Sequence, residues 1–192
     1  MPKENKKQKL EKPKKTEIKE PKKKDSENPM RKIRIEKVVL SIGATGENLE
    51  KGVKLLKIIT GGKPSKMKAR RRIPTLNVRP GLEVGAVVTI RKKAEDVLKR
   101  MLNAIDNKLK RKQMSENNFS FGIKEYIEIP GTEYQREIGI MGLDVTVVFR
   151  RAGRRIRFKK IKRGRIPARQ IISKEEIIKF MENKFGTRFE GK

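Results

Sequence analysis

Cysteine, histidine and tryptophan are all absent from this sequence of 192 residues. Their absence excludes disulfides, Cys/His zinc sites, thiol nucleophiles and imidazole bases. The chain also lacks a run of the ~18–20 apolar residues that a membrane span needs, and its N-terminal residues show no apolar secretory signal. We therefore expect a soluble, cytoplasmic protein that uses no metal ion or other cofactor.

Acidic residues are few compared with basic ones. The sequence has 52 Lys and Arg against 23 Asp and Glu, which gives a formal net charge of +29. A fold with this excess repels itself unless a polyanion is bound nearby. Nucleic acid is the first candidate and an anionic membrane surface the second, but the absence of a basic amphipathic helix counts against a membrane.

The chain divides into a tail and one domain. Residues 1–29 hold 11 Lys and 6 acidic residues, and Leu10 and Ile18 are their only large apolar side chains. Such a segment buries too little surface to offset its ordering entropy, so we expect a disordered basic tail. It serves either solubility or nucleic-acid binding. Residues 30–192 carry periodic apolar patterns and are expected to form the folded domain.

Alternation of apolar residues predicts strands over residues 33–42, 84–90, 119–129 and 143–149. Helical spacing predicts helices over 47–60 and 93–112, and Ser173 with Glu176 forms a capping box that opens a third helix, which ends at Gly186. Residues 64–78 are expected to form a loop or short strand that leads into a hairpin, and residues 155–161 at most a short strand. This order predicts an α+β fold: a mainly antiparallel sheet with helices packed on one face.

Two basic segments stand out along the domain. Residues 63–92 hold nine Lys or Arg and one acidic residue, and residues 150–169 hold eleven and none. Both contain Gly and Pro and lack helical periodicity, so we expect their arginines on loops, where the guanidinium fork can reach phosphate and stack on bases. Ordinary solvated surfaces mix the two signs of charge, which favours polyanion binding over solubility.

Folded RNA suits these loops better than duplex DNA, because no helix-turn-helix, zipper or finger spacing is present. Phe119, Phe121 and Phe149 lie on alternating core faces and are expected in the core. Tyr126 and Tyr134 are candidates for stacking on a base.

No enzyme motif is found. The Gly43–Gly46 turn lacks the G-x-G-x-x-G pattern, and no phosphate-binding P-loop sequence occurs. Glu125 and Glu128 are three apart on an expected strand and so face opposite sides of it. We therefore expect no catalytic residues.

Seven short pieces in order resemble a known family: IEKVVLSIG (35–43), TGGKP (60–64), KAR (68–70), IP (73–74), VTIR (88–91), NFSFGI (118–123) and EIGIMGLD (137–144). Together they resemble large-subunit ribosomal protein five, the universal 5S-rRNA-binding family, in its archaeal type. The resemblance runs from about residue 30 to about residue 185. It implies an α+β domain with a curved antiparallel sheet that holds 5S rRNA in the central protuberance.

The resemblance also implies roles for particular residues. For 5S rRNA these are Ser41 and Thr89, on the face that meets it. From the basic segments we expect further rRNA contacts by Lys63, Arg91, Arg154, Arg155, Arg157, Lys159 and Lys160. The loop near the elbow of P-site tRNA would use Lys66, Lys68, Arg70, Arg71, Arg72 and Arg79. Contact with a small-subunit protein would use Glu133, Tyr134 and Arg136. The family usually has Asn and Gln where this chain has Ser41 and Gly62.

We therefore expect a structural ribosomal protein, monomeric within the ribosome, whose partners are 5S rRNA, large-subunit rRNA, P-site tRNA and neighbouring ribosomal proteins. The alternative is a basic protein that coats nucleic acid without preferring 5S rRNA; it predicts equal affinity for duplex DNA and 5S rRNA at matched salt.

Overall fold

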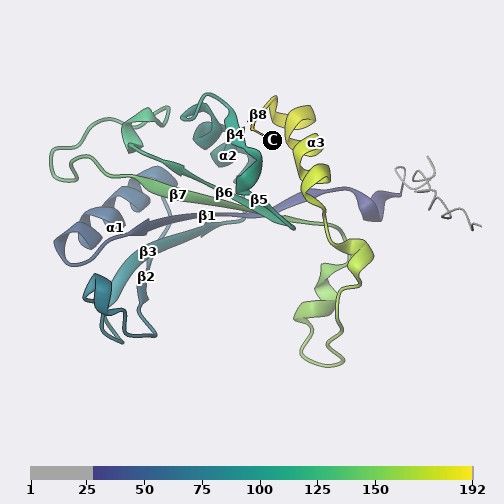
Figure 1. Cartoon of the computed structure of the whole chain (residues 1–192), viewed down its shortest axis with the longest axis horizontal. Coiled ribbons are helices and arrows are strands. Elements are labelled where there is room, and N and C mark those ends of the chain that lie inside the picture. Colours follow the sequence, from purple (N-terminus) through teal and green to yellow (C-terminus); the bar gives the residue numbers. More distant parts are fainter. Residues whose placement is uncertain (1–27, 192) are drawn as a thin grey trace, which may run out of the picture.

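A six-stranded sheet forms the centre of the protein (Figure 1). The computed structural model describes residues 28–191, so nearly all of the expected disordered tail lies outside the described residues. The helices and strands are β1 (Arg34–Gly43), α1 (Glu47–Thr60), β2 (Ser65–Lys68), β3 (Glu83–Ile90), α2 (Ala94–Asn103), β4 (Lys108–Lys110), β5 (Met114–Ser115), β6 (Asn118–Ile123), β7 (Leu143–Arg150), α3 (Lys174–Phe185) and β8 (Arg188–Glu190).

The strands of the sheet follow the order β2-β3-β1-β7-β6-β5, and each neighbouring pair is antiparallel. Alternate residues of β6 and β7 are buried, as the alternating pattern requires when one face of a sheet is covered. Figure 1 shows that the sheet is strongly twisted. The expectation of a mainly antiparallel sheet is confirmed.

The three helices cover one face of the sheet. Leu56 of α1, Leu98 of α2 and Met181 of α3 are fully buried and belong to one core cluster with Val38 and Leu40 of β1. Within residues 28–191, the other face of the sheet has no helix packed on it. No helix in the described range is long and apolar enough to cross a membrane.

The local signals for the ends of two helices are confirmed. α1 spans the predicted residues and ends where Gly61 takes the left-handed conformation at φ 63°. α3 begins with the predicted capping box, in which the Ser173 hydroxyl accepts from the backbone N–H of Glu176 and the Glu176 carboxylate accepts from the N–H of Ser173. Gly186 closes α3 in the left-handed conformation.

The prediction of a helix over residues 93–112 is wrong in its second half. α2 ends at Asn103, and Asp106 and Asn107 have positive φ angles, a conformation that Asp and Asn tolerate better than most residues. Leu109 is still buried, but in β4, which pairs with the C-terminal strand β8 in parallel. Residues 108–110 therefore form a strand, because pairing with β8 outweighs their local preference for a helix.

Two further predictions of strands are corrected. The strand predicted over 119–129 ends at Ile123, because Ile123 pairs with Leu143, the first residue of β7, and nothing continues the ladder beyond it. A 3₁₀ helix, Tyr126–Glu128, follows. The short strand considered for residues 155–161 does not form: Arg154–Phe158 make a 3₁₀ helix instead, which starts after Gly153 at φ 90°.

Residues 150–171, which include the second basic segment (150–169), are called the arginine lobe; this lobe joins β7 to α3 and projects from the sheet at the lower right of Figure 1. Two ion pairs attach it to the scaffold. Arg154 pairs with Glu36 of β1, and both side chains are mostly buried. Arg151, only 8% exposed, donates to both carboxylate oxygens of Glu176 at 2.6 and 2.7 Å.

Replacing Glu36 with Gln should destabilise the attachment of the lobe, because it leaves the mostly buried Arg154 charge unpaired. We expect a loss of about 1–3 kcal/mol in the free energy of unfolding, the usual cost of leaving a buried hydrogen-bonding group without its partner, together with faster cleavage of the lobe by trypsin. Glu137→Gln is the control, because Glu137 and Lys54 form a solvent-exposed ion pair. Its removal should lower the free energy of unfolding by less than about 0.5 kcal/mol. Urea unfolding measures the free energy of unfolding of both variants. Equal losses in the two would contradict the claim that the Glu36–Arg154 pair attaches the lobe.

Candidate nucleic-acid interface

The uncovered face of the sheet carries short side chains, many with hydroxyl groups. In β1 and β3 the residues opposite each other on this face include Val39 with Thr89 and Ser41 with Val87. On the β7 side, Ser120 of β6 lies opposite Thr146. Short side chains leave the backbone close to the surface, so a ribose or a phosphate can approach it and accept or donate hydrogen bonds.

Ser41 and Thr89 lie together on this face, as the sequence prediction required. Thr89 is exposed and Ser41 is partly exposed. Their strands are neighbours, and their register puts them on a diagonal, for which side-chain separations of about 7–8 Å are typical. Asp144 of β7 lies opposite Ser41, so the β7 side of this pair carries a negative charge and the β3 side does not.

Residues 69–82 join β2 to β3 and are named the β2–β3 loop. The loop is ordered by its own backbone: Ile73 and Val78 exchange two hydrogen bonds of 3.0 and 3.1 Å, and Ala69 bonds to Leu82 and Gly81 at 2.8 and 2.9 Å. Arg70, Arg71, Arg72 and Arg79 are all exposed. At its far end Leu76 is 69% exposed. The loop therefore presents four arginines and an apolar tip on a rigid frame.

Lys66 differs from the arginines of this loop. It lies within β2, and its ammonium contacts the carboxylates of Glu50 in α1 and Glu83 in β3, the latter at 3.2 Å. The hydrogen bond to Glu50, and next that to Glu83, raise the pKa of Lys66 above its ordinary value of 10.5. Lys66 stays charged at neutral pH, but its charge is already shared by two acids. Lys68, at the end of β2, is exposed.

Lys63 precedes β2 and Arg91 follows β3, so both lie at the open end of the β2–β3 hairpin, away from the β2–β3 loop. Lys63 is exposed between α1 and β2, and Arg91 is exposed directly after β3. Both basic segments reach out from the sheet in the same direction in Figure 1, at its lower left and lower right. The cations predicted for rRNA therefore flank the uncovered sheet face on more than one side.

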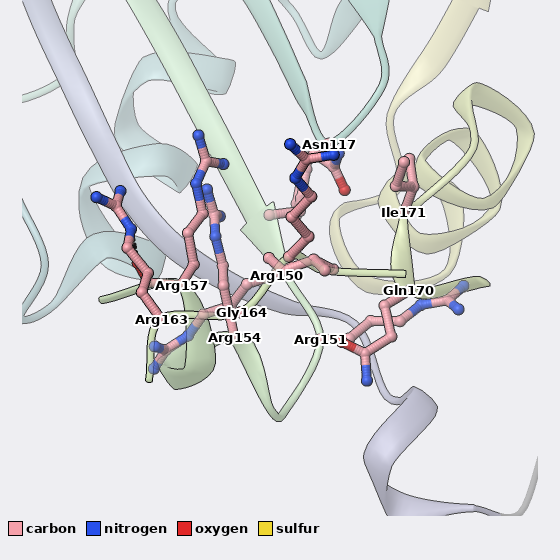
Figure 2. A pocket seen from close by; sticks show the side chains of 12 residues that line it. Asn117, Arg150, Arg151, Arg154, Arg157, Arg163, Gly164, Gln170 and Ile171 are labelled. Atoms are coloured by element: carbon pink, nitrogen blue, oxygen red, sulfur yellow. Dashed lines mark hydrogen bonds between the residues drawn. The ribbon is translucent and has the colours of Figure 1, made fainter. Parts of the chain in front are cut away.

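The arginine lobe brings together the second set of predicted cations. Arg155, Arg157, Lys159 and Lys160 are exposed, whereas Arg154 is mostly buried against Glu36. Six arginines of the lobe line a cleft of about 560 Å³ at the end of β7 (Figure 2). Lys159 and Lys160 do not line this cleft. They line a smaller hollow with Arg155, Phe158 and Ile161.

Sequence reasoning missed two apolar residues on this lobe. Phe158 is 65% exposed and Ile161 is 80% exposed, between cations. The Arg154 guanidinium lies 6.0 Å from the centre of the Phe158 ring, within cation–π range. The available signal was the position of Phe158 as the only aromatic residue in a segment without acids.

The expected role of Tyr126 in stacking is wrong, because its side chain is 1% exposed. Its hydroxyl accepts a hydrogen bond of 2.9 Å from the backbone N–H of Gln135 and so fixes the segment between the Tyr126–Glu128 3₁₀ helix and β7. The Ile138 side chain anchors the same segment in the core. Glu133, Tyr134 and Arg136 are all exposed there, so the second tyrosine stays a candidate for contact.

The described residues offer groups that can bind a polyanion. No group of three or more acidic residues in the range 28–191 is placed to hold a metal ion. Cations on two ordered segments and an uncovered, hydroxyl-rich sheet face can neutralise and position the phosphates of a folded polyanion.

Comparison with known proteins gives two matches to models of one family. Residues 28–79 match the family described as ribosomal protein L5, and residues 83–180 match the model for the C-terminus of the same family. Among curated proteins, the large ribosomal subunit protein uL5 of Nanoarchaeum equitans is 46% identical over 83% of this chain and 96% of its own length.

Two further relatives carry the same name. The protein of Pyrobaculum aerophilum is 39% identical over 83% of this chain and 91% of its own length. That of Sulfurisphaera tokodaii is 44% identical over 81% of this chain and 91% of its own length. All six strands of the central sheet, α1 and α2 lie within the residues that the two family models match, and the chain belongs to the ribosomal protein L5 family.

Proposed function

We propose that this protein is a structural component of the large ribosomal subunit that binds 5S rRNA and helps to attach it in the central protuberance. Family membership supports the ribosomal assignment and confirms the expectation that the chain is not an enzyme. The observation that carries the 5S proposal is the uncovered face of the sheet, with Ser41 and Thr89 on neighbouring strands.

5S rRNA would lie over the β1–β3 half of this face. Thr89 is exposed there, and Lys63 and Arg91 stand at the open end of the same hairpin, where they can neutralise phosphates. Asp144 lies beside Ser41 on the β7 side and would repel a phosphate backbone placed further across the sheet. Hydroxyl groups on a flat surface suit the ribose and phosphate contacts by which folded RNA is recognised.

Replacing Thr89 with Glu should weaken binding of 5S rRNA by at least about tenfold, because it sets a negative charge against the RNA backbone. The matched control is Ser120→Glu, which adds the same charge to the same face on β6 and should weaken binding much less. Filter binding at fixed salt, with an unrelated transcript of equal length as competitor, measures both. Unchanged 5S affinity in Thr89→Glu would refute the placement, and equal affinity of the wild type for both transcripts would favour the general coating protein.

The β2–β3 loop would contact P-site tRNA through Arg70, Arg71, Arg72 and Arg79. All four are exposed and the frame of the loop is fixed by backbone hydrogen bonds, so little ordering entropy opposes the contact. Lys66 is left out of this contact because Glu50 and Glu83 already hold it. Lys68 lies at the base of the loop and would add only long-range attraction.

Changing Arg70, Arg71 and Arg72 together to Ala should weaken retention of P-site tRNA on reconstituted ribosomes by at least about fivefold, or roughly 1 kcal/mol, while 5S binding stays nearly intact. The control changes Lys110, Arg111 and Lys112 to Ala, three exposed cations in another part of the domain. If 5S binding collapsed in the first variant, the division of roles between loop and sheet would be wrong.

Two other surfaces complete the proposal. The segment that carries Glu133, Tyr134 and Arg136 would contact a small-subunit protein; Tyr and Arg are the residue types that dominate protein interfaces, and Tyr126 fixes the backbone beneath them. The arginine lobe would face rRNA of the large subunit, with Arg155, Arg157, Lys159 and Lys160 exposed for phosphate contacts.

A further inference from the structure

The cleft in the arginine lobe has the size of a small-ligand site. Its volume is about 560 Å³, within the range of roughly 300–1,000 Å³ in which proteins hold small molecules. Figure 2 shows Arg154, Arg157 and Arg163 on one side of the end of β7, with Gln170 and Ile171 on the other. Its arginines are Arg150, Arg151, Arg154, Arg157, Arg163 and Arg165, and no acidic side chain lines it.

The six arginines fall into two groups. Arg151 and Arg154 are paired with Glu176 and Glu36 and so serve as parts of the wall. The other four form no ion pair with any carboxylate in the described residues. The Nε of Arg163 donates to the carbonyl of Arg157 at 2.8 Å, which fixes the two segments that carry them. Four guanidinium groups held around one cleft make a site for an anion.

The cleft is not only cationic. Ile166 and Ile171 also line it, and Ile171 is 38% exposed. The Oδ1 atom of Asn117 accepts from the backbone N–H of Ile172 at 2.9 Å. Its Nδ2 therefore faces its surroundings as a donor with no partner in the described range. A phosphate alone would leave the apolar wall without a contact, and an apolar ligand would leave four cations unpaired. The lining therefore suits a ligand that has both an anionic and an apolar part.

We infer that this cleft binds a single unpaired nucleotide of RNA, extruded from its helix, and that the inference rests on the proposed role of the lobe in facing rRNA. Arg157 and Arg165 hold the phosphates on either side of the nucleotide, and its base packs on Ile166 and Ile171. The amide of Asn117 can donate to an acceptor on the edge of the base. A paired base cannot enter, because its faces are stacked and its edge is occupied.

An acidic peptide is the strongest alternative occupant. Carboxylates would satisfy the same guanidinium groups, but they leave the apolar wall without a partner. Guanidinium planes also stack on bases, which a carboxylate cannot exploit. RNA is therefore favoured, and the peptide is kept as one outcome of the test.

The test uses the full chain and three RNA hairpins with the same stem at fixed salt. One hairpin is fully paired, one has a single bulged adenosine, and one has an abasic residue in place of that adenosine. The last two carry equal numbers of phosphates, so their difference measures the base alone. We expect the bulged hairpin to bind roughly tenfold more tightly than the other two, because only its base can leave water and pack on Ile166 and Ile171.

Variants of the cleft test whether the preference for the bulged hairpin arises there. Changing Arg157 and Arg165 together to Ala should abolish the preference for the bulge, and changing both to Lys should keep most of the general affinity while lowering the preference. The control changes Lys159 and Lys160 to Ala: it removes two charges from the same lobe outside the cleft and should weaken all hairpins equally. Thermal unfolding of each variant shows that the fold is intact.

Equal binding of the bulged and paired hairpins, or of the bulged and abasic ones, would overturn the inference. So would displacement of the bulged hairpin by a glutamate-rich peptide that binds as tightly as the RNA. Binding of 5S rRNA is measured in parallel, so loss of the bulge preference with intact 5S preference removes this inference alone. In reconstituted large subunits, ultraviolet crosslinks from the lobe to large-subunit rRNA rather than 5S rRNA would identify the source of the nucleotide. Crosslinks to neither RNA would refute the inference that the cleft binds a nucleotide of rRNA.

Discussion

The fold tolerates a net charge of +29 because carboxylates pair with the innermost cation of each basic segment. Glu36 and Glu176 hold the arginine lobe against β1 and α3 through Arg154 and Arg151. Glu50 and Glu83 hold Lys66 beneath the β2–β3 loop. These pairs neutralise the cations nearest the core, where repulsion would destabilise the fold, and leave the outer arginines unpaired for a polyanion.

The sheet supplies the rigidity that these segments need. Its covered face is sealed by three helices and by fully buried side chains such as Phe119, Val147 and Phe149, so the fold places its apolar residues on one side. The uncovered face carries short side chains at Val39, Ser41, Val87 and Thr89, and the two basic segments reach out beyond it. An RNA helix needs this arrangement, because its phosphates must reach cations without being kept away by long side chains in between.

Most of the fold could be predicted from the sequence because its signals are local. The ends of α1 and α3 depend on Gly61, Gly186 and the Ser173 capping box, and alternation marks β1, β3 and β7. The errors lie where a distant partner decides. Leu109 has the spacing of a helical residue but pairs with Phe189 in a parallel ladder, and the strand from Asn118 stops because β7 begins opposite Ile123.

The same division applies to the candidate site. The order of residues along the chain was enough to predict a polyanion partner and the two segments that carry the cations, because charge and the lack of acids are properties of composition. Which cations are available depends on the packed fold: it pairs Lys66 and Arg154 with acids far away in the chain, buries Tyr126 and exposes Phe158. The fold also gathers six arginines from residues 150–165 around one cleft. Ion pairing, burial and concavity depend on which elements pack together, and no local pattern specifies that.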